Sequence, residues 1–140
     1  MESTKSIKTG VIGVGSMGKH HARVYNEISN LVAVADPDEV QGKKVAEKYG
    51  IRWYSDYNQM LEHVDAVSIS VPTYLHYEVA KNVIKSDVSL LIEKPLSSNF
   101  QEASSIVELS EDKKLTLAVG QIERYNPAVS YLKKSLSEGL

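Results

Sequence analysis

The sequence predicts an α/β fold with a doubly wound parallel sheet, and three observations support this prediction. Short apolar, β-branched runs alternate with longer segments of helical periodicity along the whole chain. The apolar runs are continuous, as in Leu31–Ala35 (LVAVA), which is typical of parallel strands covered by helices on both faces. Most runs end at glycine, proline or aspartate, where the chain is expected to turn. Right-handed crossovers would then place a ligand at the carboxyl ends of the strands.

In the first half of the chain, each expected strand is an apolar run followed by a turn signal. These strands are Ile7–Val14, Leu31–Ala35 and Ile51–Tyr54. Helical spacing over Ser16–Ile28 puts four apolar side chains on one face, namely Met17, Val24, Tyr25 and Ile28. A second helix is expected over Asp38–Tyr49, because Gly50 suits the position after a helix C-terminus. A short helix is expected over Asp56–His63.

The second half repeats this scheme. Its expected strands are Ala66–Val71, Leu90–Ile92 and Leu115–Val119. A helix over Leu75–Ser86 would turn four apolar residues inward, namely Leu75, Val79, Val83 and Ile84. Ser98 and Gln101 match a capping box for a helix that reaches about Lys113. A last helix is expected from about Ala128 to Ser137, after a linker over Gly120–Pro127.

Composition excludes several classes of function. Lys and Arg number 16 against 18 Asp and Glu, and this balance argues against nucleic-acid and membrane-surface partners. The absence of cysteine excludes disulfide scaffolds and thiol nucleophiles, and it fits the reducing cytoplasm that we expect. The sequence contains no H-E-x-x-H, G-x-S-x-G or P-loop motif, so we expect no metal site of that type. No apolar run approaches the ~20 residues that span a bilayer.

A complete G-x-G-x-x-G motif, formed by Gly13, Gly15 and Gly18, follows the first expected strand and opens a helix. In this context the motif predicts a dinucleotide site and hence a Rossmann fold. Gly15 would let the backbone approach a diphosphate, and the N–H groups at the helix start, at Ser16 and Met17, would bind it. The alternative is a purely structural glycine turn.

Asp36 ends the second expected strand, 18 residues after Gly18. A carboxylate there would accept hydrogen bonds from the adenosine ribose of NAD and repel the 2′-phosphate of NADP. We therefore expect NAD as the cofactor in preference to NADP. The alternative is that Asp36-Pro37-Asp38 only caps the next helix, and both roles can coexist.

Glu93-Lys94-Pro95 follows the fifth expected strand, at the edge of the sheet where a ligand would lie. The Lys94–Pro95 bond is a candidate for the cis form. The alternative is an ordinary strand exit with solvated charges. His20 and His21 are expected on a helix surface.

Four segments together resemble the glucose–fructose oxidoreductase, inositol 2-dehydrogenase and rhizopine-catabolism (Gfo/Idh/MocA) family of NAD(P)-dependent dehydrogenases. They are GVIGVGSMGKHHARVY (10–25), VAVADPD (32–38), DAVSISVPTYLHYEVAKNVI (65–84) and LLIEKPLS (90–97). The segment GQIERYNPAV (120–129) resembles the branch that contains UDP-N-acetylglucosamine 3-dehydrogenases.

The resemblance implies a role for each matching residue. Gly13, Gly15 and Gly18 would bind the diphosphate, and Asp36 the adenosine ribose. Pro72, Thr73 and His76 would line the cofactor cleft, although His76 could instead cap its own helical turn. Glu93 would contact the nicotinamide ribose, and Lys94 would orient a substrate hydroxyl and assist proton movement. Gln121 and Arg124 would lie near the nicotinamide and the entrance to a second domain.

The resemblance also implies a substrate domain beyond this sequence. Residues 1–120 would be the NAD-binding domain, and residues 121–140 a linker and first helix leading to a C-terminal domain that is absent from this chain. Family members use an Asp and a His, four residues apart, in that domain, and no such pair occurs here. We therefore expect a fragment or truncated product that is catalytically incomplete alone, and a homo-oligomer in the complete enzyme.

These features predict the dinucleotide-binding part of an NAD-dependent oxidoreductase. Its substrate would be a secondary alcohol of a sugar, nucleotide sugar or cyclitol. A stand-alone NAD-binding or sensing module is one alternative. A methyltransferase is another, and the third glycine and the Glu93-Lys94-Pro95 segment argue against it.

Overall fold

The computed structural model describes residues 7–139 and contains a six-stranded, all-parallel sheet with the order β3-β2-β1-β4-β5-β6. The predicted doubly wound α/β fold is therefore confirmed. The strands are β1 (Lys8–Ile12), β2 (Asn30–Ala35), β3 (Arg52–Tyr54), β4 (Ala66–Ile69), β5 (Ser89–Glu93) and β6 (Leu117–Gly120). The helices are α1 (Gly18–Ile28), α2 (Glu39–Tyr49), α3 (His76–Lys85), α4 (Phe100–Asp112) and α5 (Pro127–Ser137). In residues 7–139 no helix is long and apolar enough to cross a membrane.

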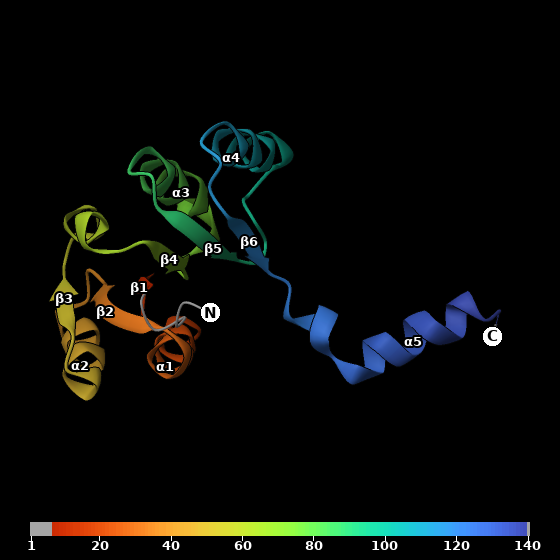
Figure 1. Cartoon of the computed structure of the whole chain (residues 1–140), viewed down its shortest axis with the longest axis horizontal. Helices are drawn as coiled ribbons and strands as arrows, with labels where there is room; N and C mark the ends of the chain where they lie inside the picture. The colour runs from red at the N-terminus through yellow and green to blue at the C-terminus, as the bar shows by residue number, and fades with distance from the viewer. Residues whose placement is uncertain (1–6, 140) are drawn as a thin grey trace.

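The helices form two layers, with α1 and α2 on one side of the sheet and α3 and α4 on the other (Figure 1). Neighbouring residues of a strand face opposite layers, which explains the continuous apolar runs. Thus Val11 and Val34 pack with α1 and α2, whereas Ile12 and Ala35 belong to the core under α3 and α4.

The layers are unequal in extent. On the α1 side, the buried cluster draws its residues from β1, β2, α1, α2 and the loop after β1. The α3 side also buries side chains of β4 and β5. Helix α5 projects away from the sheet, and no side chain of it is buried (Figure 1). Helix α1 reaches β4 on this side, where Ser68 is fully buried, but one face of β5 and β6 is left without a helical layer.

Of the four apolar residues expected on one face of α1, only Tyr25 packs toward the sheet. Met17, Val24 and Ile28 are exposed, and the buried residues of α1 are Gly18 and Ala22. Small side chains let this helix approach the strands closely, so the larger apolar residues remain beside the uncovered part of the sheet.

Three local predictions need correction. The expected helix over Asp56–His63 is two 3₁₀ turns, because the Asp56 side chain caps the first turn and the fully buried Met60 separates it from the second. Asn99, rather than Ser98, caps α4, since its side chain accepts from Glu102 N. Leu75 lies in a 3₁₀ turn before α3 and is exposed.

Candidate functional site

The three glycines of the loop after β1 differ in whether the packing of the chain requires them. A Cβ atom on Gly18 would lie 1.8 Å from the carbonyl oxygen of Gly13, and Gly13 has a positive φ of 81°. A Cβ on Gly15 would meet only Gln41 Nε2, at 3.9 Å. Packing therefore requires glycine at Gly13 and Gly18, whereas the space beside Gly15 is open to a ligand.

The start of α1 is suited to bind an anion. Met17 makes no side-chain cap, and the first turn contains no acidic residue. The caps of α2, α4 and α5 are supplied instead by the side chains of Asp38, Asn99 and Asn126. The N–H groups and positive dipole end of α1 thus remain available beside Gly15, where a diphosphate would be stabilised.

Asp36 fastens the glycine loop to the end of β2. Its Oδ2 accepts from Val14 N at 2.8 Å and its Oδ1 from Asp38 N at 2.9 Å, while the residue is 8% exposed. The cap of α2 is made by Asp38, which accepts from Gln41 N at 3.0 Å. Asp36 lines a pocket of about 360 Å³. Its other lining residues include Gly13, Pro37, Ser55, Tyr57, Val71 and Leu75.

His76 joins the loops after β4 and β5. Its Nδ1 lies 2.9 Å from the carbonyl oxygen of Pro95, and its Nε2 lies 2.9 Å from that of Val71. The side chain is 1% exposed, so it supports these loops from behind rather than lining the cleft. It also does not cap its own helical turn. The Lys94–Pro95 bond is cis.

The remaining predicted residues lie at the carboxyl edge of the sheet. Those on its exposed surface are Ser16, Met17, Pro72, Lys94 and Gln121, with Thr73 half-buried. Arg124 is exposed on the 3₁₀ turn Ile122–Tyr125. In residues 7–139 no three His, Asp or Glu side chains come together as a metal site.

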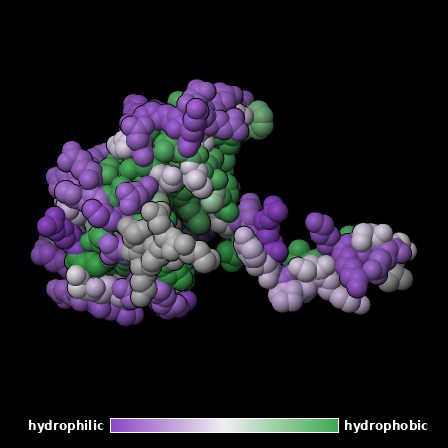
Figure 2. Space-filling view, viewed as in Figure 1, coloured by the Kyte–Doolittle hydropathy of each residue, from purple (hydrophilic) through white to green (hydrophobic). Residues whose placement is uncertain are grey.

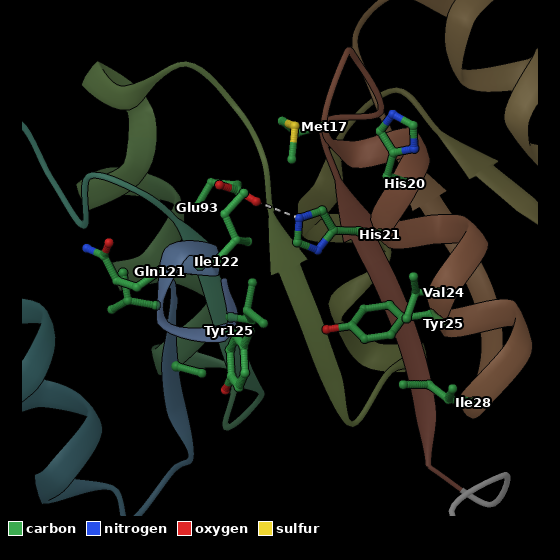
Figure 3. Close-up of a pocket in the computed structure, with 14 residues that line it drawn as sticks. Met17, His20, His21, Val24, Tyr25, Ile28, Glu93, Gln121, Ile122 and Tyr125 are labelled. Carbon is green, nitrogen blue, oxygen red and sulfur yellow. Dashed lines mark hydrogen bonds and ion pairs between the residues drawn. The ribbon is translucent and has the colours of Figure 1, made fainter. Parts of the chain in front are cut away.

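A hydrogen-bonded row of side chains crosses from β5 to α1, and the sequence did not predict it. His21 Nε2 lies 2.7 Å from Glu93 Oε1, and His21 Nδ1 lies 3.0 Å from Ser68 Oγ. Ser68 Oγ donates to the Tyr25 hydroxyl at 2.8 Å. Figure 3 shows His21 pointing from α1 toward Glu93, whereas His20 does not.

The prediction of a surface position is therefore confirmed for His20 and wrong for His21, whose side chain is 16% exposed. Helical spacing gives the physical reason, because His21 and Tyr25 follow Gly18 at three and seven residues, on the side that faces the sheet. Gly18 packs closely on the loop after β1, so residues three and seven positions later lie on the same side of the helix. This spacing is the sequence signal that could have predicted the inward orientation of His21 and Tyr25.

The environment of Tyr25 shifts its titration. Burial raises the pKa of the Tyr25 phenol above its ordinary value of 10.0, and the hydrogen bond from Ser68 opposes this rise. The phenol thus stays protonated at neutral pH.

The row borders a groove of about 400 Å³ between α1 and the uncovered strands. Its lining residues include Met17, Val24, Tyr25, Leu91, Glu93, Gly120, Ile122 and Tyr125. In Figure 3, Tyr25 and Tyr125 lie on opposite sides of this groove. Figure 2 shows hydrophobic surface (green) open to view over the same part of the sheet, between the two helical layers.

Residues 7–121 match the Gfo/Idh/MocA family, described as an oxidoreductase family with an NAD-binding Rossmann fold. This range includes the glycine loop, Asp36, the Glu93-Lys94-Pro95 segment and Gln121. The chain belongs to this family. It is the NAD-binding Rossmann domain of that family, as the resemblance implied.

Relatives of known function include two kinds of dehydrogenase. The chain is 38% identical to the UDP-N-acetylglucosamine 3-dehydrogenase of Acidithiobacillus ferrooxidans, and the match covers 92% of this chain and 41% of that protein. The solved structure of that enzyme superposes with a TM-score of 0.87. Inositol 2-dehydrogenase from Corynebacterium glutamicum is 31% identical, with 97% of this chain and 42% of that protein covered.

A solved myo-inositol 2-dehydrogenase from Lactobacillus plantarum gives a TM-score of 0.86 at 26% identity and covers 95% of this chain. The chain thus spans about two fifths of the length of these family members.

Proposed function

We propose that this chain binds NAD across the carboxyl edge of its sheet and supplies the cofactor half of a dehydrogenase. The observation that carries the proposal is the open space beside Gly15 at an uncapped helix start. Packing explains the other two glycines of the motif, but a Cβ at Gly15 would fill only space that a ligand can occupy. Membership of an NAD-binding family supports the same proposal.

The diphosphate would lie over Gly15, Ser16 and Met17, where backbone N–H groups donate to it. The adenosine would occupy the pocket beside Asp36, with the ribose hydroxyls donating to the carboxylate. A 2′-phosphate would meet a largely buried like charge there, so NAD is favoured over NADP.

The nicotinamide end would lie over the loops after β4, β5 and β6. Glu93 would accept from the nicotinamide ribose, and Pro72, Thr73 and Gln121 would border the ring. Lys94 is exposed at this edge, where its ammonium would orient a substrate hydroxyl and assist the movement of its proton. When bound, the cofactor accepts or donates the hydride, while the protein supplies orientation and electrostatics.

The substrate class we propose is a secondary alcohol of a cyclitol, sugar or nucleotide sugar. Relatives named for UDP-N-acetylglucosamine and for inositol support this class. We propose that the substrate is held by a domain corresponding to the remaining length of those relatives, after the segment 121–140. We also propose a cytoplasmic homo-oligomer for the whole protein, and the exposed apolar residues of α5 support the association.

Thermal unfolding with and without NAD tests the proposal. NAD at 100 times its dissociation constant should add about 2.7 kcal/mol to the free energy of unfolding and raise the melting temperature by several degrees. Gly15→Val should fold, because its side chain enters open space, yet it should show no shift. S-adenosylmethionine serves as the control ligand. A shift with that ligand and none with NAD would contradict the proposal in favour of a methyltransferase.

The 140 residues alone should bind NAD without turnover. The positioning that makes a reaction effectively unimolecular is worth ~7–11 kcal/mol, and it requires a substrate domain. Turnover is measured as the change in NADH absorbance with a panel of inositols and nucleotide sugars. Turnover by these residues alone would show that they are a complete enzyme. Absence of turnover in a chain extended to the relatives' length would favour a sensing module.

A further inference from the structure

We propose that His21 is a positioning residue that fixes the Glu93 carboxylate at the nicotinamide end of the cofactor site. The inference rests on the proposed function, because it concerns how Glu93 meets bound NAD. It stands on the row Glu93–His21–Ser68–Tyr25, which joins β5, α1 and β4. Neither the glycine motif nor the Glu93-Lys94-Pro95 segment alone predicts the hydrogen bonds of this row.

The Glu93 carboxylate is held from three sides. Its Oε1 lies 2.7 Å from His21 Nε2, and its Oε2 accepts from Lys94 N at 3.3 Å. On the third side, a Cβ on Gly120 would lie 3.2 Å from the carboxylate atoms, so β6 approaches closely because this residue is glycine. The side chain of Glu93 is only 12% exposed, and its orientation is therefore set before any ligand arrives.

His21 can hold this carboxylate because its own ring is fixed. An ionised carboxylate only accepts hydrogen bonds, so the proton on Nε2 faces Glu93. The other ring nitrogen, Nδ1, donates to Ser68 Oγ, because the single hydroxyl proton of Ser68 goes to Tyr25; Ser68 is 0% exposed. The ring cannot turn without breaking a contact to a buried group on β4.

Fixing the Glu93 carboxylate should change the affinity only for ligands that contact it. A free glutamate side chain must be immobilised when it accepts from a ribose hydroxyl, and this lowers affinity. We expect loss of the His21 contact to weaken NAD binding by about 3- to 10-fold. ADP lacks the nicotinamide ribose, so its affinity should not change.

The test compares the ratio of the NAD and ADP dissociation constants in matched variants. His21→Gln keeps an amide that can reach and donate to Glu93, whereas His21→Asn is one methylene shorter and cannot reach it. We expect the ratio to rise about 3- to 10-fold in His21→Asn and to stay near the original value in His21→Gln. His20→Asn, on the neighbouring exposed histidine, is the control and should leave both constants unchanged.

Calorimetric titration with each ligand distinguishes the possible failures. Equal weakening of NAD and ADP in His21→Asn would show a merely structural role and overturn the inference, as would an unchanged ratio. If the unaltered chain binds neither ligand, the proposed function fails and this inference with it. If the unaltered chain binds NAD and ADP equally, NAD binding stands and the positioning of Glu93 is overturned.

Discussion

The two halves of the sheet differ in how completely the chain builds them. Around β1, β2 and β3, helices α1 and α2 cover one face and side chains are buried on both. Around β4, β5 and β6, helices α3 and α4 cover one face; on the other, α1 reaches β4, whereas β5 and β6 border a groove of about 400 Å³. The same fold thus has a closed half and an open half.

The cofactor site spans both halves, and this difference separates its two ends. At the adenosine end, Asp36 is held by two short backbone contacts, from the glycine loop and the next turn, and by a longer one of 3.3 Å from the Gln41 side chain. At the nicotinamide end, Glu93 is held by a side chain of another element, His21, beside the open groove. The adenosine end depends mainly on local backbone geometry, whereas the nicotinamide end depends on contacts between distant segments.

The open half continues into α5, which carries apolar residues that are exposed to solvent. Val129, Leu132 and Leu136 recur on α5 at helical spacing, and each is exposed. Exposed apolar stripes of this kind mark interaction surfaces. The closed half is therefore expected to govern stability and cofactor choice, and the open half to govern association.

The largest expected effect is a loss of stability in the closed half of the sheet. Gly18→Ala should lower the free energy of unfolding by about 3 kcal/mol or more, because its Cβ would lie 1.8 Å from the Gly13 carbonyl oxygen. Gly15→Ala, in open space, should change it by no more than about 0.5 kcal/mol. Urea unfolding of both variants measures the difference. Equal stabilities would show that the loop does not need glycine for packing.

The next effect concerns the open half. We expect the chain to self-associate through α5, and Leu132→Glu combined with Leu136→Glu should weaken that association about 100-fold, since each buried leucine contributes at least about 1.5 kcal/mol. Lys133→Glu, on an exposed polar position of the same helix, is the control. Sedimentation velocity across a concentration series gives the constants. A monomer at all concentrations would remove the link between α5 and association.

The preference for NAD over NADP tests the adenosine end of the site, and its expected effect is smaller than the two above. We expect NAD to bind at least ~10-fold more tightly than NADP, equivalent to ~1.4 kcal/mol, because Asp36 repels the 2′-phosphate. Asp36→Ala should narrow this gap. It should also destabilise the chain by about 1–3 kcal/mol, since Val14 N would lose its acceptor. Titration of both cofactors decides it, and equal affinities for the unaltered chain would contradict the expectation.

Much of the closed half could be predicted from the sequence because its signals are local. The apolar runs, the glycine spacing and Asp36 at a strand end each act within one βαβ unit, and the structure places them as expected. Helix boundaries were less exact where two caps compete, as at Ser98 and Asn99.

The row in the open half could not be predicted in the same way. His21 and Glu93 are 72 residues apart, and their contact depends on α1 lying close to β4, beside the end of β5. The spacing from Gly18 indicates that His21 faces the sheet, but it does not identify Glu93 as its partner. His76 is similar, because its two carbonyl partners lie in different loops that only the sheet order brings together.

The smallest expected effect is a difference in alkaline stability that reports on the row itself. Burial raises the pKa of Tyr25 in the folded chain above its ordinary value of 10.0. As pH rises above about 10, the phenol of the unfolded chain loses its proton before that of the folded chain. The unfolded state then binds fewer protons, so stability falls with pH, by at most about 1.4 kcal/mol per pH unit from this group.

Tyr25→Phe removes this group and should flatten the fall in unfolding free energy between about pH 10 and 11 relative to the unaltered chain. At neutral pH the variant should lose about 1 kcal/mol, because Ser68 no longer donates to a phenol oxygen. Tyr131→Phe, an exposed tyrosine on α5, is the control and should leave the pH dependence unchanged. The two slopes come from urea unfolding at a series of pH values. Equal slopes for Tyr25→Phe and Tyr131→Phe would mean that Tyr25 is as accessible to solvent as α5, and the row beside the open groove would then be no more ordered than the helix that projects from it.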